Sequence, residues 1–233
     1  MKTLIIIPAY NEEESILKVI RDVKENGGNV DYIVINDCST DSTKSLLEKN
    51  GIEHIDLPIN LGIGGCVQTG YKYALANGYD IAVQLDGDGQ HDASYIQRLI
   101  EPIENGQADF VVGSRFIDGN GFQSSRTRRI GINIISRQIK LLSGLKIRDV
   151  TSGMRACSRQ LIEVFTRDYA DDYPEPGSLL TVGLKKAKVV EVPVKMRERQ
   201  GGISSISPLN SVYYMVKVCI SLVLLKLGSR RDG

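Results

Sequence analysis

Residues 81–92 read IAVQLDGDGQHD, and the rest of the chain can be interpreted by working outward from this stretch. Residues 81–85 are mostly apolar and predict a buried strand. Two carboxylates, Asp86 and Asp88, follow at once, each with a glycine after it. A strand that delivers paired carboxylates to its end is suited to holding a hard cation such as Mg²⁺ or Mn²⁺ on the phosphates of a ligand. The same residue types also form ordinary Asp/Gly turns, so the stretch alone leaves both interpretations open.

Predicted strands alternate with predicted helices on both sides of this stretch. Short apolar runs predict strands at residues 3–8, 31–36, 53–57, 81–85, 110–114 and 189–194. Helical periodicity fills most of the intervals and the connections are short, which predicts an α/β fold with a mostly parallel sheet and helices on both faces. The first helix is expected to open at residues 9–14, with its glutamates in the first turn.

In a sheet of this kind, ligands collect beyond the carboxyl ends of the strands. Polar segments follow three strands of the first half, at residues 8–12, 37–41 and 86–92. We therefore expect these segments to meet at one edge of the sheet, which favours a binding site over a simple turn. The sequence contains neither a P-loop nor a complete dinucleotide fingerprint, so no hydride chemistry is indicated.

The charges are strongly segregated, although the formal net charge is only +1. Residues 1–118 carry 9 Lys and Arg against 19 Asp and Glu, whereas residues 119–233 carry 20 against 9. An acidic half beside a basic half suggests a metal site that faces groups for an anionic substrate or a membrane surface. Nucleic acid is not an expected partner, because the basic region lacks interleaved aromatic residues and a recognisable binding motif.

Two features of the sequence bear on where the protein works. The four cysteines are far apart and show no pattern for disulfides or zinc, which fits a reducing compartment. The N-terminal apolar run is too short for a signal peptide, so a cytoplasmic location is expected.

The C-terminal segment, residues 207–233, predicts a helix rich in apolar residues. Its uncharged core, residues 218–225, lies between Lys217 and Lys226 and is too short for a stable span of the bilayer. We expect an amphipathic helix that lies on a membrane surface or on a partner, or that packs on the protein's own core.

Seven ordered motifs carry a resemblance to a known family. They are PAYNE at 8–12, NDCSTDST at 36–43, NLGIGG at 60–65, DGDGQHD at 86–92, GSR at 113–115, DVTSGMR at 149–155 and RQGGISS at 199–205. Together they resemble family 2 glycosyltransferases, most of all the branch of dolichyl- and polyprenyl-phosphate sugar synthases. The resemblance covers about residues 1–206 and implies a GT-A fold, with a nucleotide-sugar and metal half at 1–118 and an acceptor half at 119–206.

The resemblance also implies roles for the matching acidic and aromatic positions. Pro8, Tyr10 and Glu12 would contact the base and ribose of a nucleotide-diphosphate sugar, and Asp37 would contact the base ring. Asp86 and Asp88 would form the metal-binding pair for Mg²⁺ or Mn²⁺, with Gln90 as a further candidate ligand. Asp88 is expected to be the direct ligand.

Basic and hydroxyl residues of the second half complete the implied site. Arg115, Arg129 and Arg199 are candidates for binding the diphosphate or an acceptor phosphate, with Arg115 also a candidate catalytic group. Ser152 and Ser204, which lie in two of the motifs, are candidates for substrate contact. The synthases commonly carry SK where this chain has Ser204-Ser205.

The acceptor decides whether the reaction needs a base. A sugar hydroxyl needs a carboxylate to take its proton, and Asp172 and Glu175 are the candidates, whereas a lipid phosphate is already ionised. We expect an inverting transfer to a polyprenyl phosphate or a lipid-linked glycan at the cytoplasmic face of the membrane. A soluble or cell-wall glycan hydroxyl is the alternative acceptor.

One further function stays open, that of a catalytically idle nucleotide-sugar-binding scaffold, although the intact Asp86/Asp88 pair disfavours it. The oligomeric state is a separate question, and the sequence is compatible with a homo-oligomer.

Overall fold

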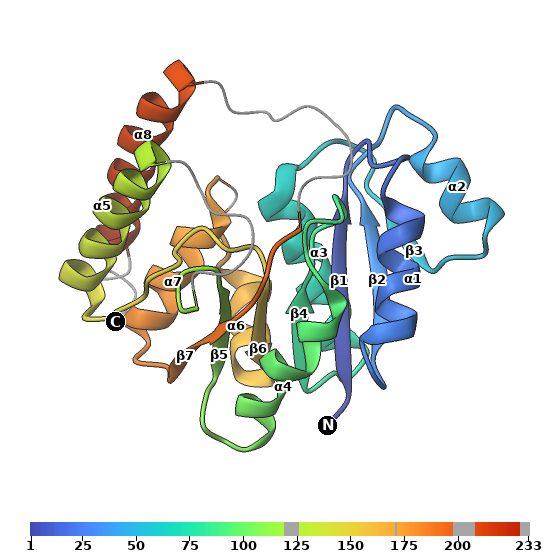
Figure 1. The fold of residues 1–233 in the computed structure, drawn as a ribbon, viewed down its shortest axis with the longest axis horizontal. Helices are drawn as coiled ribbons and strands as arrows, with labels where there is room; N and C mark the ends of the chain where they lie inside the picture. The colour runs from blue at the N-terminus through green and yellow to red at the C-terminus, as the bar shows by residue number, and fades with distance from the viewer. Residues whose placement is uncertain (119–125, 171, 198–207, 229–233) are drawn as a thin grey trace.

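The computed structural model describes residues 1–118, 126–170, 172–197 and 208–228. A seven-stranded sheet, in the order β3-β2-β1-β4-β6-β5-β7, has helices on both faces (Figure 1). The elements in chain order are β1 (Thr3–Ala9), α1 (Ile16–Asn26), β2 (Asp31–Asn36), α2 (Thr43–Lys49), β3 (His54–Asp56), α3 (Gly62–Ala76), β4 (Ile81–Gln84), a 3₁₀ turn η1 (Ala93–Tyr95), α4 (Ile96–Glu104), β5 (Phe110–Ser114), α5 (Arg126–Ser143), β6 (Arg155–Ser158), α6 (Arg159–Arg167), α7 (Pro174–Leu184), β7 (Val189–Pro193) and α8 (Pro208–Gly228). The predicted mostly parallel α/β sheet is confirmed.

Among the described strands, β6 is the one that runs antiparallel, and it pairs with both β4 and β5. Ala156 of β6 lies opposite Val83 on one side and Val111 on the other. Strands of the acidic and basic halves of the chain therefore interleave in one sheet, since β6 lies between β4 and β5. The carboxyl ends of the parallel strands all face the same edge, which is where the polar segments collect.

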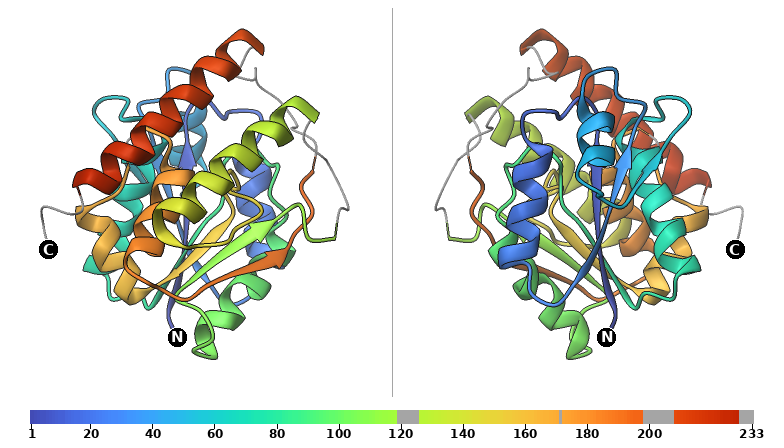
Figure 2. Two further views of the ribbon diagram at one scale, coloured as in Figure 1. Left: turned by 90° about the vertical axis from the view of Figure 1, so that its left-hand side faces the viewer. Right: turned by 90° about the vertical axis from the view of Figure 1, so that its right-hand side faces the viewer.

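Alternating side chains of β1 supply both hydrophobic cores. Leu4 and Ile6 point to the face covered by α3, α5, α6 and α7, whereas Ile5 and Ile7 point to the face covered by α1 and α4 (Figure 2). All four are fully buried. This is the period of two that a strand buried on both faces requires, and it explains why the strand reads as a continuous apolar run.

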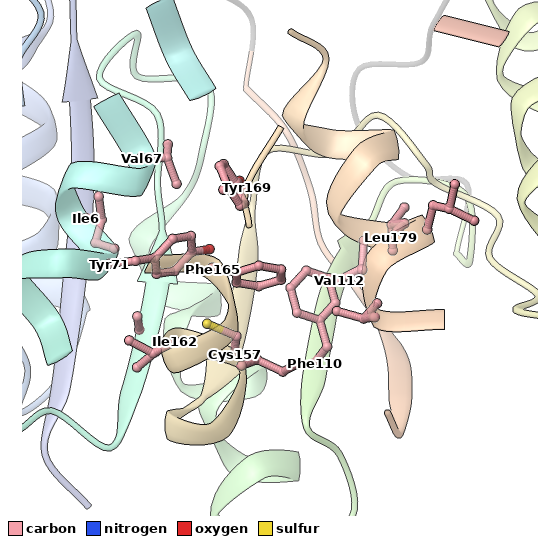
Figure 3. Close-up of a cluster of buried hydrophobic side chains, with 14 of the residues drawn as sticks. Ile6, Val67, Tyr71, Phe110, Val112, Cys157, Ile162, Phe165, Tyr169 and Leu179 are labelled. Carbon is pink, nitrogen blue, oxygen red and sulfur yellow. The ribbon is translucent and has the colours of Figure 1, made fainter. Parts of the chain in front are cut away.

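An aromatic cluster joins the two halves of the molecule (Figure 3). The ring of Phe165 in α6 lies 5.2 Å from that of Tyr71 in α3 and 6.0 Å from that of Phe110 in β5, and Tyr169 is 5.2 Å from Phe165. Tilted and edge-on contacts at these separations are favourable beyond the apolar area that they bury. The relative position of the two halves is thus set by shared packing.

The helix expected to open at residues 9–14 begins later, at Ile16, and none of the glutamates lies in its first turn. That prediction is wrong because the segment makes tertiary contacts instead. Asn11 adopts a left-handed backbone, with φ of 54°, and its side-chain oxygen accepts a hydrogen bond from the backbone N–H of Thr40 at 2.8 Å. The backbone N–H of Glu12 donates to the hydroxyl of Thr43 at 2.9 Å. The segment is therefore a turn that joins β1 to the loop after β2.

Helix α8 lies alongside α5 (Figure 1) and packs on the protein's own core through Val218 and Leu222. The side-chain amide of Gln138 in α5 donates to the carbonyl of Cys219 at 2.7 Å and fixes the pair. Among the described residues, none of the helices has the combined length and hydropathy that crossing a membrane would need.

Candidate active site

The three polar segments meet beyond the carboxyl ends of β1, β2 and β4, as expected from the strand order. With two side chains from α3 they enclose a cleft of about 200 Å³. The lining residues are Pro8, Ala9, Tyr10, Glu12, Asp37, Ile63, Cys66, Asp86, Gly87 and Asp88. Six of the residues named from the sequence as substrate or metal contacts therefore surround one space.

Asp37 ties three segments of this cleft together. It follows β2 and is buried, and its backbone N–H donates to the carbonyl of Ala9 at 2.9 Å. One carboxylate oxygen accepts a hydrogen bond from the backbone N–H of Leu61 at 2.7 Å, just before α3. Because this bond fixes the orientation of the carboxylate, its remaining lone pairs are directed rather than free to rotate.

Tyr10 is held at the mouth of the cleft by the turn that follows β1. The ring is 48% exposed. Its neighbour Asn11 is anchored to the loop after β2, so Tyr10 projects from a braced segment. A half-exposed ring beside a polar cleft is suited to stacking on a planar base.

Close packing of the loop after β4 requires glycine between the two carboxylates. The backbone N–H of Gly87 donates to the carbonyl of Pro8 at 3.2 Å, and a Cβ at this position would lie only 2.8 Å from that oxygen. Gly89 has a φ of +76°, a conformation that costs glycine nothing. Asp86 and Asp88 are thereby brought to the cleft from either side of Gly87.

A divalent cation fits the donor set at this edge. Asp86 and Asp88 are partly buried carboxylates, and hard cations take oxygen ligands of this kind together with substrate phosphates. One oxygen of Asp88 accepts the backbone N–H of Gln90 at 3.0 Å, which braces the side chain. The backbone carbonyl of Gln90 accepts the N–H of Arg197 at 2.9 Å, and ligation by the Gln90 side chain stays a prediction.

Arg115 lies away from this cleft, at the end of β5, and is 5% exposed. It lines a second cleft of about 240 Å³ with Tyr95 and Lys195. Its Nε and Nη2 donate to the two carboxylate oxygens of Asp149, each at 2.7 Å, and Nη2 also donates to Thr151 at 2.8 Å. This bidentate pair gives Arg115 a clear structural role, and its contact with a phosphate stays a prediction.

Two other candidates of the second half have different surroundings. The guanidinium of Arg129 lies 5.1 Å from the centre of the Phe116 ring, and the guanidinium of Arg115 lies 5.4 Å from it. Both arginines therefore contact one aromatic residue. Ser152 is fully buried, and its hydroxyl accepts the N–H of Met154 at 3.3 Å in a local turn. Substrate contact by either residue stays a prediction.

Arg155 is a buried cation that the sequence did not single out for a role. Its Nε donates to the carbonyl of Ser152 at 2.6 Å, and its Nη1 donates to the carbonyl of Glu175 and the hydroxyl of Ser178 at 2.6 and 2.7 Å. The start of α7 is thereby pinned to β6. Burial raises the pKa of the Glu175 carboxyl, the nearby charge of Arg155 opposes that shift, and Asp86 adds to it.

Glu175 lies in the first turn of α7, and the charge of Asp86 acts on its carboxyl. Asp172 faces elsewhere, because it is exposed and forms an ion pair with Lys217 of α8 at 3.7 Å. The remaining two candidates, Arg199 and Ser204, lie outside the described residues.

Asp149, Arg155 and His91 are buried residues whose side-chain hydrogen bonds the sequence did not reveal. All three lie inside the motifs that carry the family resemblance, so the motifs did indicate these positions. Their partners are set by folding, however, and spacing along the chain could not name them.

The mostly parallel sheet and the acidic strand-end cleft define a glycosyltransferase with a GT-A fold. Residues 4–165 match the family described as Glycosyl transferase family 2, and the chain belongs to that family. The resemblance drawn from the sequence motifs is thus confirmed.

Several similar proteins are named as transferases or synthases of polyprenyl- or dolichyl-phosphate sugars. Polyprenol monophosphomannose synthase of Mycolicibacterium smegmatis is 29% identical over 230 residues, which cover 93% of this chain and 85% of that protein. UDP-N-acetylglucosamine--dolichyl-phosphate N-acetylglucosaminyltransferase of Methanococcus voltae is 31% identical, with 98% and 97% covered. Undecaprenyl-phosphate mannosyltransferase of Micrococcus luteus is 30% identical, with 89% and 88% covered.

Among solved structures, glucosyl-3-phosphoglycerate synthase from Mycobacterium tuberculosis, in complex with Mn²⁺, UDP-glucose and phosphoglyceric acid, has the same fold. Its TM-score is 0.73 at 21% identity, with 97% of this chain and 80% of that chain covered. The GT-A fold predicted from the sequence is thereby confirmed.

Proposed function

We propose that this chain transfers a sugar from a nucleoside-diphosphate sugar to a polyprenyl phosphate, with inversion at the anomeric carbon, at a membrane surface. The observation that carries the proposal is the cleft in which Tyr10, Asp37, Asp86 and Asp88 converge. The acceptor is proposed from relatives at 29–31% identity that act on polyprenyl or dolichyl phosphates.

Each side chain of the cleft has a task in this proposal. Tyr10 covers the base, and Asp37, braced by Leu61, accepts a hydrogen bond from the base ring. Asp86 and Asp88 would hold Mg²⁺ or Mn²⁺, and the structural relative contains Mn²⁺. When bound, the cation supplies positive charge that offsets the charge developing on the departing diphosphate.

The acceptor phosphate attacks without help from a base, because a phosphate monoester is ionised at neutral pH. Direct displacement on one face of the sugar inverts its anomeric configuration. Basic residues of the second half, among them Arg129, are suited to drawing an anionic acceptor toward the cleft.

A screen of nucleotide sugars by thermal shift tests the donor side of the proposal. At least one nucleotide sugar is expected to raise the Tm in the presence of Mg²⁺ or Mn²⁺, and to do so much less with EDTA. Uridine, guanosine and thymidine diphosphate sugars belong in the screen, because Asp37 and Tyr10 do not distinguish among their bases. The absence of a shift with every donor and both cations would contradict the proposal.

A glycan hydroxyl is a second candidate acceptor, because Glu175 is a carboxyl in the first turn of α7 with a raised pKa, which suits a general base. The variant Glu175→Gln distinguishes a lipid-phosphate acceptor from a glycan-hydroxyl acceptor. With a lipid-phosphate acceptor we expect turnover to stay within about tenfold of wild type, whereas loss of a general base costs about 10²–10⁴-fold. Steady-state kinetics with each acceptor, at several pH values, measures the difference.

The same variant has an expected effect on stability. The folded pKa of Glu175 lies above the ordinary value of 4.5, so the folded state binds this proton more tightly than the unfolded chain does. The free energy of unfolding therefore falls as pH rises from about 4.5 through the raised pKa. Glu175→Gln removes this loss, and urea titrations at pH 5 and pH 8 should show a smaller decline in the variant. An equal decline in both proteins would contradict the raised pKa of this carboxyl.

We also propose that α5 and α8 form the surface that meets the membrane. The exposed apolar side chains of α8 recur along one face, at Val216, Ile220, Val223, Leu224 and Leu227, and those of α5 are Ile130, Ile134 and Leu141. The sequences of both helices contain basic residues and no acidic ones. Apolar stripes on helices whose own charged residues are all basic are complementary to an anionic lipid surface.

Vesicle flotation tests this surface on the full chain. The double variant Ile220→Glu/Leu224→Glu changes side chains that are 55% and 62% exposed, so its fold should be unaffected. We expect its binding to vesicles with anionic lipid to fall at least about tenfold. Ile59→Glu, an exposed apolar residue elsewhere, is the matched control and should bind like wild type. Equal flotation of all three proteins would contradict the surface.

A further inference from the structure

Gly153, in the turn before β6, lies against the carboxylate of Asp86. It is buried, and its φ is not in the left-handed region, so its backbone conformation does not require glycine. A Cβ at this position would lie 2.5 Å from Oδ2 of Asp86 and 3.1 Å from its Cγ and Oδ1. These are the three nearest heavy atoms, and all belong to one side chain. The space of a side chain at position 153 is therefore occupied by the carboxylate.

The backbone on both sides of Gly153 is fixed by hydrogen bonds. The carbonyl of Ser152 accepts a bond from Nε of Arg155 at 2.6 Å. The carbonyl of Met154 accepts one from the backbone N–H of Gly113 in β5 at 2.8 Å. Because the turn is held from two directions, a methyl group added at position 153 displaces the neighbouring carboxylate rather than the turn.

The backbone of Asp86 is fixed as well. Its N–H donates to Nδ1 of His91 at 3.0 Å, and the N–H of Gly87 donates to the carbonyl of Pro8 at 3.2 Å. The side chain is 33% exposed and lines the nucleotide cleft, and Oδ1 accepts a bond from the amide of Gln84 at 3.2 Å. A carboxylate pushed from position 153 must therefore move by rotation about its own side-chain bonds.

We propose that Gly153 is a positioning residue for the metal site, because its missing side chain leaves the space in which the Asp86 carboxylate is seated. The inference rests on the proposed function, since it assumes that Asp86 and Asp88 hold a divalent cation. An ordinary C···O contact is about 3.3–3.6 Å, so a methyl at position 153 shifts Oδ2 by about 1 Å. Mg²⁺ requires oxygen ligands at about 2.0–2.1 Å in nearly ideal geometry, and a shift of that size disrupts such a set.

The contact joins the two halves of the chain at the proposed metal site. Asp86 belongs to the half that carries the nucleotide cleft, whereas Gly153 belongs to the acceptor half. The turn that contains Gly153 also holds Arg115 through the bidentate pair with Asp149. The acceptor half thereby sets the position of a carboxylate on which the donor's cation depends.

The variant Gly153→Ala tests this role with one added methyl group and no change of charge. The matched control is Gly131→Ala in α5, where φ is also outside the left-handed region. A Cβ at Gly131 would lie 2.6 Å from Sδ of Met215, which is again the far end of a flexible side chain. The two variants therefore impose similar crowding, and only Gly153→Ala imposes it on the proposed metal site.

The first measurement is the binding of Mn²⁺ in the presence of UDP or GDP, followed by the electron paramagnetic resonance of free Mn²⁺. At a temperature where each variant is folded, we expect Gly153→Ala to weaken Mn²⁺ binding at least about tenfold. Gly131→Ala should bind like wild type. Unchanged binding in Gly153→Ala overturns the inference if Asp88→Ala has lost binding. Unchanged binding in Asp88→Ala overturns the proposed function instead.

The second measurement is thermal unfolding without ligand, in the wild type and in Asp86→Ala. Removal of the carboxylate empties the space beside position 153, so the added methyl no longer meets an obstacle. We expect Gly153→Ala to lower the Tm of the wild type but to leave the Tm of Asp86→Ala unchanged or higher, since alanine restricts the unfolded chain more than glycine does. An equal change of Tm in both backgrounds overturns the inference.

Discussion

Replacing Asp149 by alanine is expected to lower the free energy of unfolding by about 3–5 kcal/mol, although the residue does not line the nucleotide cleft. Asp149 is fully buried and holds the guanidinium of Arg115 with both carboxylate oxygens at 2.7 Å. One of these oxygens also accepts the backbone N–H of Arg115 at 3.1 Å. Removal of the carboxylate leaves a buried positive charge without its counter-ion, which is why the expected loss is large.

Urea titration of the wild type and of Asp149→Ala measures this loss. Asp118→Ala is the matched control, because Asp118 is an exposed carboxylate at the second cleft, where Arg115 also lies. The control should stay within about 0.5 kcal/mol of wild type. A loss in Asp149→Ala no larger than that of the control would contradict the assignment of a buried ion pair.

The same pair allows a test of the role of Arg115. Lysine cannot reproduce the two parallel hydrogen bonds of a guanidinium, so Arg115→Lys should be destabilised. If Arg115 only stabilises the fold through Asp149, the kcat of the folded variant stays near that of wild type. If its charge contacts a phosphate, KM or kcat changes at temperatures where the variant is still fully folded.

Asp88→Ala is expected to reduce turnover by about 10²–10³-fold without unfolding the protein. The side chain is partly exposed at the cleft, and the bond from the Gln90 N–H at 3.0 Å is local to the loop. The loss arises because the cation that offsets the charge of the leaving diphosphate is no longer held. Initial rates at saturating donor, over a range of Mn²⁺ concentrations, measure it.

The control for Asp88→Ala is Glu104→Ala, an exposed carboxylate at the end of α4 that pairs loosely with the N-terminal amine at 3.9 Å. It should turn over like wild type. Recovery of Asp88→Ala to the wild-type rate at high Mn²⁺ would mean that Asp88 aids affinity alone. An unchanged rate at low Mn²⁺ would remove Asp88 from the site.

The sequence could predict the parts of the fold that depend on local pattern and on general rules of sheets. The strands β1, β2, β4, β5 and β7 are short apolar runs, and parallel strands bring their carboxyl ends to one edge. From these two facts follows the meeting of Tyr10, Asp37 and Asp86 in one cleft. These residues are far apart along the chain, but the parallel strands bring them to the same edge of the sheet.

The central antiparallel strand could not be predicted in this way. β6 has four residues and begins with Arg155, which reads as a surface residue because a charge is rarely buried. It is buried here because acceptors from two separate segments meet its guanidinium: Val150 and Ser152 in the turn before β6, and Glu175 in α7. Helix α6 was also missed, although Leu161, Ile162 and Phe165 have the spacing of a buried helical face.

The turn after β1 shows how tertiary contacts override local preference. Three consecutive glutamates before an apolar periodic run suit a first helical turn. Instead, Glu12 accepts a hydrogen bond from the hydroxyl of Ser15 at 2.8 Å, and Glu13 accepts one from the backbone N–H of Ser42 at 2.9 Å. Ser15 lies in the same turn, directly before α1, whereas Ser42 lies on the loop after β2, so Glu13 ties the turn to a distant part of the chain.

The transfer of labelled sugar into an organic phase tests the central claim most directly. The full chain is incubated with Mn²⁺, the nucleotide sugar that raises its Tm, and either a polyprenyl phosphate or the matching polyprenol. We predict that label enters the organic phase with the phosphate alone, and that EDTA or Asp88→Ala abolishes the transfer. Equal labelling of the polyprenol, or transfer that persists without a divalent cation, would contradict the account.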